Sequence, residues 1–196
     1  MKPFAESCEQ NKQVILDVIK RQFSECKNIL EIGSGTGQHA VFFAAHLRHL
    51  HWQPSERSEN LAGIQAWLQK YPQKNISQPI ELDVTTNWPD RTFDGVFSAN
   101  TAHIMSWPEV IRFFEGISHV LQGNGLFCLY GPFNYNQQYS SESNRRFDSW
   151  LKEQDPARGI RDFADLDRLA KKNGLAFKED TKMPANNRIL IWQKKL

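Results

Sequence analysis

The chain has 196 residues, of which 40% are hydrophobic and 23% charged, and its net charge at pH 7 is +2. This length and composition suit one globular domain and exclude a disordered protein. No apolar run reaches the roughly 18 residues that span a membrane, and the basic residues are scattered rather than clustered as a nucleic-acid-binding face requires. We therefore expect neither a membrane nor a nucleic acid as a partner.

The cysteine content indicates a reducing environment. The three cysteines are odd in number and lack metal-ligand spacing, so we expect no metal site: Cys8, Cys26 and Cys128. The first twenty residues are too polar for a secretory signal, which favours the cytoplasm. The oligomeric state cannot be predicted from these residues.

Strands and helices alternate along the chain after an N-terminal helix. Apolar residues at helical spacing predict helices over residues 8–24, 38–48, 58–71, 106–122, 144–153 and 162–172. Short apolar runs predict strands over 28–33, 50–55, 79–84, 93–99, 125–131, 175–180 and 187–194.

This alternation predicts a single doubly wound α/β domain over 1–196, with a mostly parallel seven-stranded sheet and helices on both faces. The last two strands are joined by too few residues for a parallel return, so one strand near the sheet edge must be antiparallel. The polar stretch 132–160 is too long for an ordinary connection, and its aromatic residues favour a lid.

The stretch NILEIGSGTGQHA, residues 28–40, places three glycines at alternate positions between a strand and a helix. Glycines at such a turn let a ligand approach the backbone, and in a doubly wound sheet this turn lies at the ligand-binding edge. Two cofactor classes compete for it. A dinucleotide fingerprint would have its third glycine at the position of Gln38, which disfavours that class.

Acidic residues accompany the first three predicted strands. Glu31 precedes the glycines, Glu56 ends the second strand, and Asp83 ends the third. At strand ends that face a ligand, Glu56 suits two ribose hydroxyls and Asp83 suits the amino group of adenine. Carboxylates beside bare amides suit a cofactor without phosphate better than they suit a pyrophosphate.

The stretch LEIGSGTG resembles the first motif of class I S-adenosylmethionine (SAM)-dependent methyltransferases, an apolar strand that ends in an acidic residue and G-x-G-x-G. Essentially the full chain, including WQPSE at 52–56, YGPF at 130–133, SNRRFD at 143–148 and MPANN at 183–187, resembles the small uncharacterised family typified by methyltransferase-like protein 26. That family usually has Asp after WQPS, where this chain has Glu56. The resemblance implies the class I fold and SAM as cofactor, without an assigned substrate.

The predicted cofactor residues follow from the motif and from the strand ends: Glu31, Gly33, Gly35, Gly37, Glu56, Asp83 and Asn100. Asn100 is included because it directly follows the central fourth strand. Three loops leave the sheet at this same edge and are expected to meet around the methyl group: 99–106, 131–147 and 181–187.

These loops are predicted to bring His103, Tyr135 and Asn186 toward a methyl acceptor, with His103 as the base if a proton must leave. His103 is equally suited to capping the helix that follows, and Asn186 to making the hairpin turn. Arg161 and Asp162, at a predicted helix start, are expected to form a surface pair.

The sequence therefore predicts a SAM-dependent methyltransferase that acts on an unidentified small molecule, because the predicted elements include no appended domain that would grip a macromolecule. Two alternatives stay open. The first is an NAD-binding oxidoreductase, which Gln38 and the lack of a Tyr-x-x-x-Lys pattern disfavour. The second is a non-catalytic SAM-binding or interaction protein, which the sequence does not exclude because fold does not determine function.

Overall fold

The computed structural model describes residues 3–86 and 88–196. Its helices are α1 (Glu6–Gln22), α2 (Gln38–His46), α3 (Leu61–Lys70), α4 (Trp107–Val120), α5 (Glu142–Gln154) and α6 (Phe163–Lys172), and the short 3₁₀ helix η1 (Ser58–Asn60) precedes α3. The strands are β1 (Asn28–Ile32), β2 (His51–Glu56), β3 (Ile80–Glu81), β4 (Phe93–Ala99), β5 (Leu121–Gly131), β6 (Phe133–Asn134), β7 (Arg161–Asp162), β8 (Leu175–Lys182) and β9 (Arg188–Lys194).

The main sheet has the strand order β3-β2-β1-β4-β5-β9-β8. In the described sheet, β9 runs antiparallel to both neighbours and all other pairs are parallel. The predicted fold class, a mostly parallel seven-stranded sheet with one reversed strand near its edge, is thereby confirmed. The strand order changes direction between β1 and β4, the switch point where ligands bind in such sheets.

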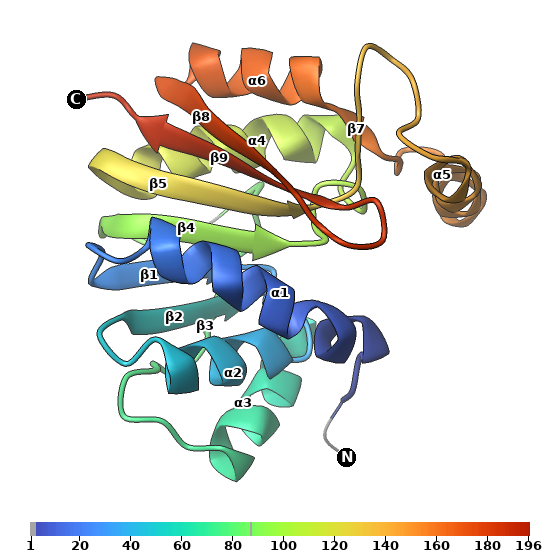
Figure 1. Ribbon diagram of the computed structural model, residues 1–196. Coiled ribbons are helices and arrows are strands. Elements are labelled where there is room, and N and C mark those ends of the chain that lie inside the picture. The colour runs from blue at the N-terminus through green and yellow to red at the C-terminus, as the bar shows by residue number, and fades with distance from the viewer. Residues whose placement is uncertain (1–2, 87) are drawn as a thin grey trace.

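Alternate side chains of the central strands enter two separate cores. On β5, Cys128 and Tyr130 pack in a cluster that includes α1 and α2. Phe127 and Leu129 pack in a second cluster that includes α4 and α6. Figure 1 shows these two pairs of helices on opposite sides of the sheet, as predicted. Strands buried on both faces explain the nearly continuous apolar runs in the sequence.

Strand β3 is shorter than predicted: it spans Ile80–Glu81 rather than 79–84. Asp83 Oδ1 accepts hydrogen bonds from the backbone N–H of Thr85 at 2.8 Å and from its hydroxyl at 2.6 Å. An Asp that binds the backbone two residues ahead forms a turn, and this turn ends the strand. Asp83 therefore stays at the carboxyl edge of the sheet.

The segment 132–160 contains the predicted helix as α5, which lies beyond the carboxyl ends of β4 and β5 (Figure 1). The sequence did not predict β6 and β7, which pair in parallel as a small second sheet. Asp162 joins these parts: Oδ2 accepts from the Gln137 N–H at 2.6 Å, and Oδ1 accepts from the Ala164 N–H at 2.9 Å and caps α6. The expected surface pair of Arg161 and Asp162 is thus wrong, because both side chains bind backbone groups.

The start of α4 carries a capping box, in which Ser106 and Glu109 bond reciprocally. Within the described residues, no helix combines the length and apolar character that a bilayer crossing needs. The same residues contain no cluster of His, Cys, Asp or Glu side chains suited to a metal ion.

Candidate functional site

All three glycines of the turn after β1 have left-handed φ angles, +73° at Gly33, +55° at Gly35 and +88° at Gly37. A Cβ on Gly33 would lie 2.5 Å from Cγ2 of Thr101. One on Gly37 would lie 3.0 Å from Cα of Ile64. One on Gly35 would meet no described atom within 4 Å. Close packing therefore explains why glycine is needed at positions 33 and 37, whereas Gly35 faces open space.

The open space beside Gly35 belongs to a cavity of about 380 Å³, which we call the first cavity. Most of the predicted cofactor residues line it: Gly33, Gly35, Glu56, Asp83 and Asn100. Glu31 and Gly37 are missing from its described lining. The carboxyl edge of the sheet thus brings together predicted residues from four separate segments.

Glu31 lies buried beside the turn instead of lining the first cavity. Its Oε2 accepts hydrogen bonds from the Ser34 hydroxyl at 2.9 Å and from the indole N–H of Trp52 at 3.0 Å. Burial raises the pKa of the Glu31 carboxyl to about 7, although both hydrogen bonds act to lower it. Glu31 therefore holds the glycine turn in shape from its buried side.

We expect Glu31→Gln to change how stability depends on pH. Because folding raises this pKa from 4.5 to about 7, this carboxyl contributes its full stabilisation below pH 4.5, and the wild type loses up to about 3 kcal/mol of unfolding free energy as the pH rises from 4.5 through 7. Gln keeps an oxygen acceptor for Ser34 and Trp52 but does not titrate. Denaturant unfolding at about pH 5 and about pH 8 should show a smaller loss in the variant. Equal losses would contradict this account of Glu31.

Glu56 reaches from the end of β2 to the glycine turn. Its Oε2 accepts from the Gly35 N–H at 2.7 Å, and its Oε1 accepts from the Arg57 N–H at 2.9 Å. A phosphate bound at this turn would need the Gly35 amide as a donor. Since Glu56 occupies that amide and adds negative charge, the geometry disfavours a pyrophosphate and with it the NAD alternative.

Asp83 lines the same cavity from the turn after β3. Hydrogen bonds from the side chain and backbone of Thr85 hold the pKa of Asp83 below its usual value, so the group is ionised at neutral pH. Its Oδ2 lies 3.9 Å from Nε of Arg57. With a side chain about one-third exposed (35%), Asp83 is accessible to a ligand from the cavity.

A second cavity, of about 660 Å³, adjoins the first at Asn100, which lines both. Asn100 has φ +58°, and its N–H donates to the Tyr130 carbonyl at 2.9 Å. The turn after β4 is thereby held against the end of β5. The other walls come from α1, α5 and the 184–187 turn. Figure 1 shows the N-terminal end of α1, the helix α5 and the turn between β8 and β9 beside the carboxyl ends of the strands. His103 and Asn186, two of the predicted acceptor residues, line this second cavity.

His103 is buried, and its ring packs edge-on against Phe147 with centroids 5.3 Å apart. Burial, and after it the charge of Arg161, lowers the pKa of His103 to about 4. The ring is therefore neutral at physiological pH and is a weak base. The alternative role as a helix cap is wrong, because Ser106 caps α4.

Tyr135 is absent from the described lining of the second cavity, which corrects its predicted placement. Its hydroxyl donates to Oδ2 of Asp180 at 2.6 Å, and its ring stacks on Phe163 with centroids 5.8 Å apart. Tyr135 and Gln138 exchange backbone hydrogen bonds across a tight turn. This turn directs the Tyr135 side chain toward Asp180 on β8.

The predicted site residues include none from α1, yet this helix supplies one wall of the second cavity. Ser7, Gln10, Asn11 and Val14 line it. Their spacing places them on one helical face, and this mostly polar face was the available signal. Asn11 is buried, and its Oδ1 lies 2.7 Å from Nε2 of His39.

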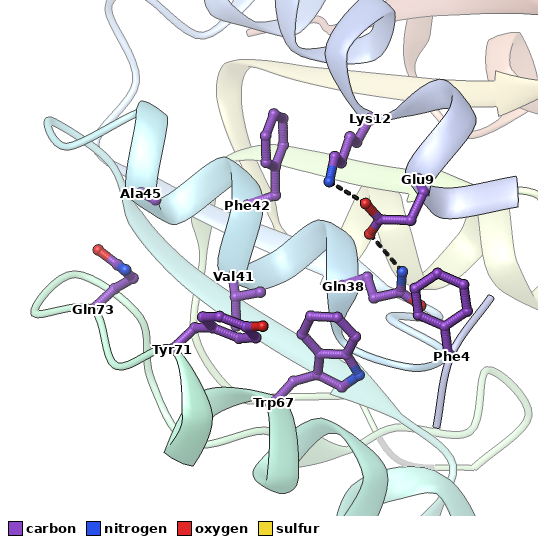
Figure 2. Close-up of a pocket in the computed structure, with 10 residues that line it drawn as sticks. All are labelled: Phe4, Glu9, Lys12, Gln38, Val41, Phe42, Ala45, Trp67, Tyr71 and Gln73. Atoms are coloured by element: carbon purple, nitrogen blue, oxygen red, sulfur yellow. Dashed lines mark hydrogen bonds and ion pairs between the residues drawn. The ribbon is translucent and has the colours of Figure 1, made fainter. Parts of the chain in front are cut away.

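Gln38 ties α1 to the glycine turn. Its Oε1 accepts from the Ala5 N–H at 2.6 Å, and its Nε2 donates to Glu9 at 2.7 Å. Figure 2 shows Gln38, Glu9 and Lys12 across from Trp67 in a third cavity of about 400 Å³. In the described part of the chain, this third cavity shares no lining residue with the other two. The residue that replaces the third glycine of a dinucleotide motif thus anchors a wall of the second cavity.

Solved structures of methyltransferases have the same fold. An O-methyltransferase family protein from Burkholderia thailandensis matches 97% of this chain with a TM-score of 0.85 and 11% identity, over 58% of its own chain. Human N-acetylserotonin methyltransferase in complex with SAM matches 97% with a TM-score of 0.81 and 15% identity, over 53% of its chain. Mitomycin 7-O-methyltransferase matches 92% with a TM-score of 0.78 and 16% identity, over 54% of its chain.

The present chain therefore spans little more than half the length of these proteins, and the likeness establishes the fold. A family model described as "Protein of unknown function (DUF938)" matches residues 2–194.

Proposed function

The chain belongs to the DUF938 family, and we propose that it is a SAM-dependent methyltransferase that acts on a small molecule. One observation carries this proposal: two cavities at the carboxyl edge of the sheet meet at Asn100. Methyl transfer needs a cofactor site and an acceptor site that adjoin in this way. The fold shared with O-methyltransferases, one of them in complex with SAM, supports the choice of cofactor.

The residues of the first cavity fit SAM. Gly35 leaves space at the turn, Glu56 and Asp83 offer carboxylates for the ribose hydroxyls and the adenine amino group, and Asn100 lies where the cavities meet. When bound, SAM supplies a methyl group on a positively charged sulfur. The lining favours a cation, since its acidic side chains outnumber its basic ones: Glu56, Glu59, Asp83 and Glu109 against Arg57 and Arg158.

The second cavity would hold the acceptor. Transfer to a hydroxyl forms a carbon–oxygen bond, breaks the carbon–sulfur bond and releases one proton. His103 can receive that proton and pass it to water, but a pKa near 4 makes it a weak base. We therefore give His103 and Asn186 the role of orienting the acceptor, and Tyr135 has no part in this site.

Calorimetric titration with S-adenosylhomocysteine (SAH) tests the cofactor site. SAH should bind and NAD should not bind comparably. Glu56→Ala and Asp83→Ala should each weaken SAH binding by about 10–100-fold, or about 1–3 kcal/mol, because each removes a charged hydrogen-bond acceptor. Glu115→Ala is the matched control, because Glu115 is a partly exposed residue of α4 outside the described lining of the first cavity, and it should leave the affinity unchanged. NAD binding tighter than SAH binding would overturn the proposal.

Two finer parts of the proposal rest on sequence. The first is kinship with the family typified by methyltransferase-like protein 26, supported by the motifs WQPSE, YGPF and MPANN. The second is a cytoplasmic location, supported by three free cysteines: Cys8, Cys26 and Cys128.

A further inference from the structure

The second cavity is lined by uncharged side chains. Amides, hydroxyls, one imidazole and apolar groups surround it, and among its described lining residues there is no Asp, Glu, Lys or Arg. The first cavity, which adjoins it, is by contrast lined by several charged side chains. Since burial lowers the pKa of His103 to about 4, the imidazole carries no charge at neutral pH either. A charged ligand would therefore find no ion-pair partner in the second cavity.

The charge of Arg161 acts on His103, and two of the three guanidinium nitrogens of Arg161 donate to backbone carbonyls. Its Nε donates to the Ala102 carbonyl at 3.1 Å, and its terminal nitrogen donates to the carbonyl oxygens of Met105 and Ala157. Arg161 is not among the described residues that line the second cavity. It therefore holds the surrounding backbone in place rather than offering a partner to an anion.

The amide on the α1 side presents a donor. Asn11 Oδ1 lies 2.7 Å from Nε2 of His39. Burial lowers the pKa of His39 to about 4, so the neutral ring donates its Nε2–H to this oxygen. The amide nitrogen of Asn11 is then the group available to Tyr130 and to a ligand.

The amides on the opposite side present acceptors. Asn144 uses its Nδ2 to donate to Oγ of Ser140 at 2.8 Å and to the Asn186 carbonyl at 3.2 Å. Asn186 uses its Nδ2 to donate to Oγ of Ser143 at 3.1 Å. Their side-chain oxygens are therefore the atoms that can accept from a ligand. The cavity thus offers a donor on one wall and acceptors on another, each held by a protein partner.

We propose that the methyl acceptor is an uncharged small molecule that carries both hydrogen-bond donors and acceptors on an apolar body, and that this cavity rejects carboxylates, phosphates and ammonium ions. The apolar side chains Val14, Pro132 and Phe147 suit such a body, and the volume of about 660 Å³ suits a ligand of drug-like size. Burying an unpaired charge here is strongly unfavourable, whereas a neutral polar group finds partners. The identity of this ligand as a methyl acceptor rests on the proposed function.

Matched probes test this selectivity on the full chain saturated with SAH. Tyrosol, tyramine and hydroxyphenylacetate share a phenol ring and differ in a terminal hydroxyl, ammonium or carboxylate, and benzamide, benzylamine and benzoate form a second set. Calorimetry should show the neutral member of a set binding at least about tenfold more tightly than its charged analogues. Charged members that bind as tightly, or a lack of binding by both neutral members, would overturn the inference.

Ser143→Asp provides the matched variant. Ser143 lies in the first turn of α5, where a carboxylate is favourable, and Asp keeps an acceptor for Asn186. The added charge should improve tyramine binding by about tenfold and leave SAH binding intact. Unchanged tyramine binding would count against the inference. SAH titration separates the two proposals. If the wild type does not bind SAH, the proposed function is refuted. If it binds SAH but binds charged probes as tightly as neutral ones, only this inference is refuted.

Discussion

Gly35→Val is expected to abolish SAH binding, with an affinity loss of more than about 100-fold, while the protein stays folded. A Cβ at Gly35 would project into the open space of the first cavity, since it meets no described atom within 4 Å. The two methyl groups of valine would then lie where we place the cofactor. Calorimetry measures the affinity, and far-UV circular dichroism with thermal melting measures the fold.

Gly174→Val is the matched control for this variant. Gly174 follows α6, has φ +74°, and likewise has no described atom within 4 Å of a Cβ. Both substitutions force a β-branched residue into a left-handed conformation, at a cost of about 1–3 kcal/mol of stability. Only Gly35→Val should lose SAH binding. Normal affinity in Gly35→Val, or an equal loss in Gly174→Val, would show that the glycine turn is structural only.

Arg161→Ala is expected to destabilise the fold by about 2–4 kcal/mol, because removal of the guanidinium leaves backbone acceptors without their donor. Arg161 donates to Ala102 and Met105, which flank His103, and to Ala157 in the segment 132–160. The loop that carries His103 would lose these hydrogen bonds to Arg161 and keep the one that the Gly159 N–H donates to the His103 carbonyl at 3.0 Å. Denaturant unfolding measures the loss of stability.

Arg168→Ala is the control for the effect of removing an arginine. Its side chain is 75% exposed and pairs with Asp165, so its loss should cost no more than about 0.5 kcal/mol. Arg161→Lys keeps the charge of Arg161 but replaces the planar fork with one ammonium, and should restore only part of the stability. Equal stability losses in Arg161→Ala and Arg168→Ala would contradict the role given to Arg161.

The fold could be predicted because its signals are local. The apolar run before Gly33 predicts β1, Ser106 and Glu109 predict the start of α4, and the short link before β9 predicts its reversal. The end of β3 was harder to predict, since Asp83 forms a turn with Thr85 through side-chain bonds that apolar periodicity does not report.

Some residues of the candidate site could likewise be predicted from local signals, and others could not. Glu56, Asp83 and Asn100 could be placed together because parallel strands end at one edge of a sheet. Tyr135 could not, because positive φ angles at Asn136 and Gln137 make a tight turn that sets its direction. Its partner Asp180 lies on another strand, and a hydrogen bond between such distant residues leaves no pattern in the local sequence.

A crystal structure of the protein with bound SAH tests the central claim, that the cavities meeting at Asn100 are a cofactor site and an acceptor site. We expect SAH in the first cavity, in contact with Gly35, Glu56 and Asp83, with its sulfur beside Asn100 and open to the second cavity. SAH bound in the third cavity, between α1 and α3, or a sulfur closed off from the second cavity by side chains, would contradict the account.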